Sequence, residues 1–146
     1  KYFGSSLVSE DDISFCGEGI LPGQSILDAP IFVGRKQTWL IDQMAIGFSL
    51  VVFVDEEKTA KSITKSLDEV CRQLDLVEQY LVVTSKRFNG ISKKFPCDTT
   101  GLAFERWAAS DGSVYLVRPD HHVAARWKAT PTISELKKAC RKSISL

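Results

Sequence analysis

The run from Phe48 to Val54 (FSLVVFV) is the sequence feature that most constrains the fold of this chain. Seven residues rich in Val and Phe, closed at once by Asp55, are typical of a strand that is buried on both faces. From Ala60 to Leu74, apolar residues then recur at helical spacing, with lysines outside the stripe. Tyr80–Thr84 (YLVVT) predicts a second strand, so the segment is expected to form a right-handed βαβ unit.

The stretch from Ser113 to Trp127 (SVYLVRPDHHVAARW) predicts a β-hairpin near the end of the chain. Its extended runs, Val114–Val117 and Val123–Trp127, flank Pro119 and Asp120, residue types that β-turns favour. The charged residues expected at the tip are Arg118, Asp120, His121 and His122.

Weaker patterns predict the remaining elements. In chain order they are a strand Pro30–Gly34, a brief helix from Thr38 to Met44, a loop Ser85–Asp98, a short helix from Thr99 or Thr100 to Trp107, and a final helix after the capping box Thr132–Glu135. A βαβ half thus precedes a ββα half. This order predicts an α/β protein of the thioredoxin-like fold, with a central mixed sheet flanked by helices.

The redox chemistry of that fold is not expected here. A thioredoxin carries a CxxC dithiol after the buried strand, at a helix N-terminus that lowers the thiol pKa. The corresponding residues are Asp55-Glu56-Glu57-Lys58, whose carboxylates would repel a thiolate. The cis-proline that precedes the first hairpin strand in that fold is replaced by Asp111-Gly112-Ser113. We therefore expect no thioredoxin or glutaredoxin activity.

The cysteines leave one enzymatic alternative open. They are Cys16, Cys71, Cys97 and Cys140, and no pair has the spacing of a redox motif or a zinc knuckle. Free thiols in a reducing cytoplasm are the simplest interpretation. The alternative is a stand-alone, thiol-dependent (peroxiredoxin-like) protein that uses a single cysteine. Cys97 is the best candidate for it, because Lys93 and Lys94 could stabilise its thiolate.

Composition excludes several other classes. With 19 basic and 18 acidic residues the net charge is +1, so neither a nucleic-acid nor an anionic-membrane partner is expected. No apolar run approaches the roughly 18 residues of a membrane span, and a cytoplasmic protein is predicted.

His121 and His122 are adjacent and would point to opposite faces of a strand, which argues against a shared metal. The tryptophans are expected in the core, and no catalytic, cofactor-binding or metal-binding residue is assigned.

The hairpin also carries a resemblance to a known family. Leu116–Ala124 (LVRPDHHVA) closely resembles the LVRPDGHVAWR signature near the C-terminus of FAD-dependent aromatic-ring hydroxylases, a group that includes phenol hydroxylase and 3-(3-hydroxyphenyl)propionate hydroxylase. Gly19–Gly23 is similar to their G-x-R-x-P-H/G segment, and Leu40–Val51 to their L-x-D-x-x-x-x-x-F-x-L-L pattern. His121 departs from the signature because the family has Gly there, and a positive φ at His121 would be strained.

The resemblance implies a role within a larger enzyme. The last domain of these hydroxylases is thioredoxin-like and is thought to serve packing and dimer contacts. The parent enzyme binds FAD in an upstream domain, takes a hydride from NAD(P)H and hydroxylates a phenolic ring, so this chain would itself bind no cofactor and catalyse nothing. Residues 1–14 would be a connecting arm and residues 15–146 the domain.

Several expectations about contacts follow from the same resemblance. The start at Lys1, without Met or a leader, suggests excision from a longer protein. The implied partners are the upstream FAD and substrate domain and a second copy of the chain in a homodimer. The candidate structural or interface residues are Arg118, Pro119, Asp120 and Arg126.

Overall fold

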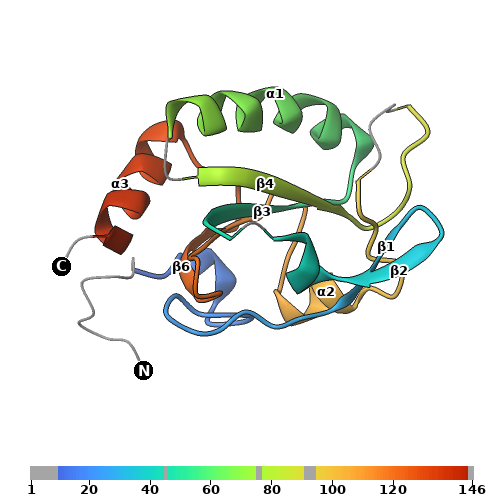
Figure 1. The fold of residues 1–146 in the computed structure, drawn as a ribbon, viewed down its shortest axis with the longest axis horizontal. Coiled ribbons are helices and arrows are strands. Elements are labelled where there is room, and N and C mark those ends of the chain that lie inside the picture. The colour runs from blue at the N-terminus through green and yellow to red at the C-terminus, as the bar shows by residue number, and fades with distance from the viewer. Residues whose placement is uncertain (1–9, 45, 75–76, 91–94, 145–146) are drawn as a thin grey trace.

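Strand β3 (Phe48–Val54) is buried along its whole length in the computed structural model, and the other elements surround it (Figure 1). The structure describes residues 10–44, 46–74, 77–90 and 95–144. The remaining elements, with η for 3₁₀ helices, are η1 (Ile13–Phe15), β1 (Pro30–Val33), β2 (Lys36–Trp39), η2 (Leu40–Gln43), α1 (Glu57–Gln73), β4 (Val77–Thr84), α2 (Leu102–Arg106), β5 (Val114–Val117), β6 (Val123–Trp127) and α3 (Ile133–Ile144).

The main sheet is mixed and has the strand order β4-β3-β5-β6. Strands β3 and β4 are parallel and are joined by α1, while β5 pairs antiparallel with both β3 and β6. Leu50 in β3 lies between Tyr80 in β4 and Leu116 in β5. The βαβ and ββα halves predicted from the sequence are therefore confirmed, and the fold is thioredoxin-like.

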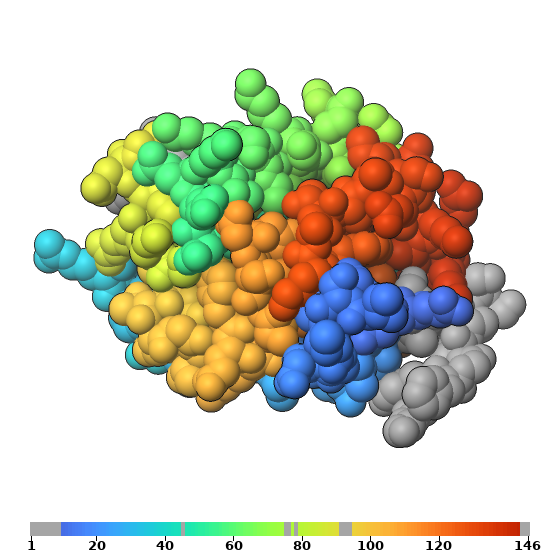
Figure 2. Space-filling model, turned by 180° about the vertical axis from the view of Figure 1, so that it is seen from behind, coloured from blue at the N-terminus to red at the C-terminus, as the bar shows by residue number. Residues whose placement is uncertain are grey.

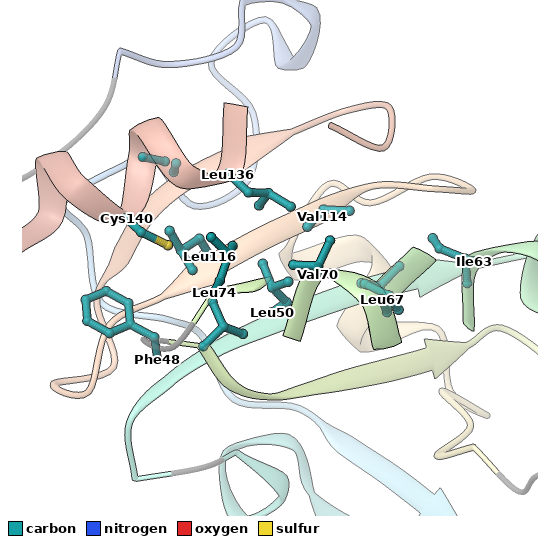
Figure 3. Packing of buried hydrophobic residues seen from close by; sticks show 14 of the residues in the cluster. Phe48, Leu50, Ile63, Leu67, Val70, Leu74, Val114, Leu116, Leu136 and Cys140 are labelled. Carbon is teal, nitrogen blue, oxygen red and sulfur yellow. The ribbon is translucent and has the colours of Figure 1, made fainter. Parts of the chain in front are cut away.

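Helices α1 and α3 cover one face of this sheet (Figure 1). Figure 3 shows the apolar side chains that meet there from β3, β5 and the two helices. The buried contributors include Leu50, Leu67, Val70, Leu116 and Leu136. Burying one such side chain contributes roughly 1.5–3 kcal/mol, so this layer supplies much of the stability. The predicted capping box also forms, since Glu135 N–H donates to Thr132 Oγ1 over 3.2 Å and Thr132 N–H to Glu135 Oε1 over 3.0 Å.

The opposite face is covered mainly by irregular segments. The N-terminal segment, β1, η2 and α2 pack there against a second apolar cluster around Phe53, Trp107 and Tyr115. Figure 2 shows the N-terminal segment, in blue, lying against the C-terminal part of the chain, in orange and red. None of the described helices is both long and apolar enough to span a bilayer.

The main departure from the prediction is β2. The brief helix expected from Thr38 does not form, because Thr38 and Trp39 pair antiparallel with β1, opposite Ile31 and Pro30 respectively. A tight turn with Gly34 at φ +63° joins the two strands, and only the 3₁₀ turn η2 follows. Trp39 therefore lies on the outer side of this hairpin with 45% of its surface exposed, and not in the core.

Two element boundaries also differ from the prediction. Strand β4 begins at Val77, three residues before the predicted Tyr80, because Phe48 of β3 extends the parallel pairing. Helix α2 begins only at Leu102, since Gly101 before it has φ +79° and interrupts a helix from Thr99 or Thr100.

Candidate functional site

At the start of α1, the position where a redox-active member of this fold carries its dithiol, the chain places a carboxylate. Asp111 Oδ1 accepts hydrogen bonds from the backbone N–H groups of Asp55, over 2.8 Å, and Glu56, over 3.1 Å. Its Oδ2 accepts from the Thr59 hydroxyl over 2.6 Å. A helix N-terminus favours negative charge. Here that preference is met by a side chain of the protein itself.

The end of β3 positions Asp111 for this contact. Gly112 N–H donates to Phe53 O over 2.8 Å, and Phe53 N–H donates to Ser113 O over 2.9 Å. These bonds hold the Asp111-Gly112-Ser113 segment beside the last residues of β3. From the sequence, this segment was predicted only as a replacement for the proline, and the hydrogen bonds of Asp111 to the two residues that precede α1 were missed. The acidic residue before Gly112 was the only signal, and it is equally typical of an ordinary turn.

Further polar contacts occupy the surrounding groups. The Ser85 hydroxyl donates to the Asp55 carboxylate, and Gly90 N–H donates to Glu57 Oε1 over 2.9 Å. Lys61 Nζ lies 3.6 Å from Glu57 Oε2. The described residues contain no group of three potential metal ligands, and this cluster holds no thiol. The arrangement stabilises the start of the helix but offers no nucleophile for thiol–disulfide exchange.

Replacing Asp111 with alanine is expected to lower the free energy of unfolding by about 1–2 kcal/mol, because two backbone N–H groups and the Thr59 hydroxyl lose their acceptor. Thermal unfolding followed by circular dichroism measures this effect. Asp111→Asn keeps one acceptor oxygen and should lose less. Equal stability of the wild type and the alanine variant would contradict the capping role.

Of the four cysteines, Cys97 and Cys140 are buried, Cys71 is partly buried and Cys16 is exposed. Cys97 is 6% exposed, and its backbone N–H and C=O both pair with Phe32 over 2.8 Å. Its expected neighbours Lys93 and Lys94 lie outside the described residues. Burial raises the pKa of Cys140 to about 11, and partial burial together with the Asp68 carboxylate raises the pKa of Cys71.

The tip of the β5–β6 hairpin brings Arg118, Pro119 and Asp120 together in one turn. Arg118 Nη2 lies 2.5 Å from Asp120 Oδ2. Partial burial alone would raise the pKa of Asp120, but the N–H of His122 and the charge of Arg118 bring it below 3.8. The turn is closed by a hydrogen bond from His121 N–H to Arg118 O over 2.9 Å. The tip is a polar turn held by the Arg118–Asp120 ion pair, and His122 Nδ1 lies 3.4 Å from Asp120 Oδ1.

His122 connects this tip to the N-terminal half of the chain. Its Nδ1 lies 3.1 Å from the backbone carbonyl of Asp120, which can only accept, so Nδ1 carries the proton. In the neutral ring Nε2 is then the acceptor for the Ser25 hydroxyl at 3.2 Å. Ile26 N–H also donates to His121 O over 2.9 Å. These bonds fasten residues 25 and 26 to the hairpin.

His121 has a φ of +63°, a left-handed backbone conformation that is strained for residues other than glycine, as the sequence predicted. Replacing His121 with glycine is expected to raise the free energy of unfolding by roughly 0.5 kcal/mol, because relief of strain outweighs the added entropy of the unfolded chain. Urea titration measures the change. His122→Gly serves as the matched control, and it should destabilise because it removes the bond to Ser25.

Arg126, the fourth candidate residue, lies apart from the tip and is 1% exposed. Its Nε and Nη2 donate to the two carboxylate oxygens of Asp11 over 2.7 and 2.8 Å. Nη1 donates to Glu18 O and, over 3.2 Å, to the Tyr115 hydroxyl. The guanidinium carbon lies 3.9 Å from the centroid of the Phe15 ring. Arg126 thus holds the N-terminal segment against the sheet.

Asp12, next to the Arg126–Asp11 pair, should make the fold less stable at acid pH. Partial burial alone would raise its pKa, but the N–H groups of Lys128 and Ser14 and the charge of Arg126 bring the pKa below 3.8. A carboxyl with a lowered folded-state pKa stabilises the fold above its unfolded pKa, and this stabilisation is lost as the pH falls through the folded value. The urea concentration at the unfolding midpoint should therefore decrease as the pH is lowered below about 4. In Asp12→Asn this decrease of the midpoint should be smaller. The same pH profile in the variant and the wild type would contradict the role of Asp12.

Comparison with known proteins supports the fold. No protein-family model and no curated protein matches the chain. Among solved structures, the flavin-dependent monooxygenase PieE, bound to FAD and substrate, aligns at 20% identity and TM-score 0.65 over 86% of this chain. Aklavinone-11 hydroxylase, bound to FAD and aklavinone, aligns at 17% identity and TM-score 0.64 over 97%. The chain spans only 20% and 26% of the length of these two proteins.

A third match has a different function. The thiol peroxidase from Chromobacterium violaceum aligns at 10% identity and TM-score 0.68, over 86% of this chain and 89% of its own. Thiol-disulfide oxidoreductases also share the fold. At these identities the likeness establishes a thioredoxin-like fold, which monooxygenases and thiol enzymes have in common.

Proposed function

We propose that this chain is a non-catalytic, thioredoxin-like C-terminal domain of an FAD-dependent aromatic monooxygenase that uses NAD(P)H. The observation that carries the proposal is the match to two flavin-dependent monooxygenases, which covers nearly all of this chain but about a fifth to a quarter of theirs. A match of this shape is what one domain of a larger enzyme would give. The hairpin motif from Leu116 to Ala124 supports the same assignment.

The start of α1 supports the non-catalytic part of the proposal. A thiol enzyme of this fold needs a cysteine near that helix end, where this chain has Asp55-Glu56-Glu57-Lys58 with the Asp111 carboxylate hydrogen-bonded to its backbone. FAD and NAD(P)H would belong to the parent enzyme, with the oxygen chemistry in its upstream part. The residues of this domain would then act by packing against that part, and a homodimer contact is a further proposed role.

The test has two arms. Titration of the purified chain with FAD, followed by flavin fluorescence, should show no binding, and stoichiometric FAD on these 146 residues alone would overturn the proposal. The reading frame upstream of the Lys1 codon should encode a glycine-rich FAD fingerprint some hundreds of residues earlier. A stop codon directly upstream of Lys1 would also overturn it.

The match to a thiol peroxidase favours one second candidate, a thiol-dependent enzyme that uses Cys97. Cys97 is only 6% exposed, which counts against access of a peroxide to its thiol. Peroxide consumption by the reduced chain, compared with Cys97→Ser, separates the candidates. Turnover that requires Cys97 would favour this enzyme over the domain assignment.

A further inference from the structure

Ser25 and His122 lie directly opposite each other in an isolated antiparallel β-bridge. Two backbone hydrogen bonds of 2.9 Å flank the pair and fix it, one accepted by His121 O and the other donated by Val123 N–H. Side chains that are directly opposite in such a pair stand on the same side of the ladder. The backbone therefore brings a hydroxyl and an imidazole together although they are 97 positions apart in the sequence.

The contacts of the His122 ring direct its basic nitrogen toward Ser25. Nδ1 lies 3.1 Å from the backbone carbonyl of Asp120 and 3.4 Å from Asp120 Oδ1, and both oxygens only accept. Nδ1 therefore carries the proton, and Nε2 accepts from the Ser25 hydroxyl at 3.2 Å. Arg118 Nη2 holds the other carboxylate oxygen at 2.5 Å. Hydroxyl, imidazole and carboxylate thus follow one another as they do around an activated serine nucleophile.

The hydroxyl at the end of this series is open to reagents. Ser25 is exposed, and the His122 side chain is 33% exposed. The flanking backbone bonds are made by the neighbours of Ser25, so its own N–H points away from the hairpin. No described residue accepts a hydrogen bond from this N–H. It is therefore free to donate to an oxygen that becomes negatively charged when Ser25 attacks a carbonyl.

The same surroundings favour a single reaction over repeated turnover. Hydrolysis of an acyl-serine passes through a second tetrahedral state, which serine hydrolases stabilise with several preorganised donors in a site shielded from water. Around Ser25, the described residues supply one such N–H, and the position is exposed to solvent. An acyl group on Ser25 is therefore expected to remain there.

We propose that Ser25 is a covalent modification site, whose hydroxyl is activated by His122 and accepts an acyl group from an activated ester, either an aryl ester or a thioester. Ser25 Oγ forms a bond to the acyl carbon, and the bond from that carbon to the leaving oxygen or sulfur breaks. The hydroxyl proton passes to His122 Nε2 and from there to the leaving group. The inference does not rest on the proposed function, and one acyl group per chain is compatible with a non-catalytic domain.

Acetylation of the chain by p-nitrophenyl acetate tests the proposal, read residue by residue with tandem mass spectrometry after an acid quench. Ser62 is the matched control, because it is an exposed hydroxyl that donates only to the Thr59 carbonyl. Ser25 should be acetylated about a hundredfold faster than Ser62, since a positioned general base contributes roughly 10²–10⁴-fold. Equal rates at the two serines would overturn the proposal.

Two variants separate the parts played by the imidazole and the carboxylate. His122→Gln keeps an amide oxygen that can accept from the hydroxyl but has no base, so acetylation of Ser25 should fall to the rate of Ser62. Asp120→Asn should have a smaller effect, because the backbone carbonyl still holds His122 Nδ1. Acetylation of the surface lysines should be the same in every variant and calibrates the dose of reagent. An unchanged rate at Ser25 in His122→Gln would overturn the proposal.

Two further measurements use the unsubstituted chain and so do not depend on the folding of a variant. Long-range ¹H–¹⁵N spectra should show the His122 proton on Nδ1, and a proton on Nε2 would remove the base. In urea the preference for Ser25 over Ser62 should vanish, and its persistence would show that the fold does not create it. Continued release of p-nitrophenolate that requires Ser25 would overturn the modification site in favour of an esterase.

Discussion

Replacing Arg126 with alanine is expected to lower the free energy of unfolding by about 2–4 kcal/mol, somewhat less than the loss of one partner of a fully buried ion pair, because the Asp11 side chain is 27% exposed and gains hydration. The side chain is 1% exposed, and its loss leaves the Asp11 carboxylate without its two donors. Glu18 O and the Tyr115 hydroxyl also lose a partner, and the Phe15 ring loses the guanidinium that covers it. Urea denaturation followed by circular dichroism measures the effect.

Two variants show whether the loss arises from the buried pair. Arg126→Met keeps the packing against Phe15 but leaves the Asp11 carboxylate unpaired. The double variant Arg126→Met with Asp11→Leu removes that carboxylate too, and should be more stable than Arg126→Ala. Arg72→Ala breaks an exposed ion pair, in which the Arg72 side chain is 73% exposed and that of Glu69 43%. Its loss should lower the free energy of unfolding by roughly 0–1 kcal/mol. Equal losses at Arg126 and Arg72 would show that Arg126 has no special role.

The elements that the sequence predicted well are those with a local, periodic pattern. Strand β3 is buried on both faces, as the run FSLVVFV indicated, and α1 buries the stripe of Ala60, Ile63, Leu67 and Val70. The T-x-x-E spacing at Thr132 gave the start of α3. In each case the information lies within a few residues, because the period of a strand or helix is written directly into the sequence.

The polar contacts that define the candidate site could not be predicted in this way. Asp111 lies 56 positions from Asp55, and Arg126 lies 115 positions from Asp11. No periodicity links two such residues, and their types fit many other roles equally well. Strand β2 was missed for a similar reason, since Thr38 and Trp39 follow the pairing with β1 over any local preference for helix.

Replacing Trp107 with alanine is expected to cost about 3–5 kcal/mol, comparable to the loss at Arg126, because a large cavity opens in the apolar cluster opposite α1 and α3. Trp107 is fully buried, with its ring centroid 5.5 Å from that of Phe53 and 4.8 Å from that of Tyr115. Its indole N–H donates to Leu27 O over 2.7 Å. Trp107→Phe keeps much of the apolar volume but loses this bond, and should cost less than the alanine variant.

The bond to Leu27 gives this variant a second, local readout. Leu27 lies in the irregular segment that packs on this side of the sheet, so Trp107 holds that segment in place. Both Trp107 variants should therefore speed amide exchange around residue 27 more than in α3, even under conditions where each remains folded. Trp39→Ala is the control, because that side chain is 45% exposed and should cost less than about 1 kcal/mol. Uniform changes in exchange across the chain would show that Trp107 stabilises the whole core without a specific effect on the segment around residue 27.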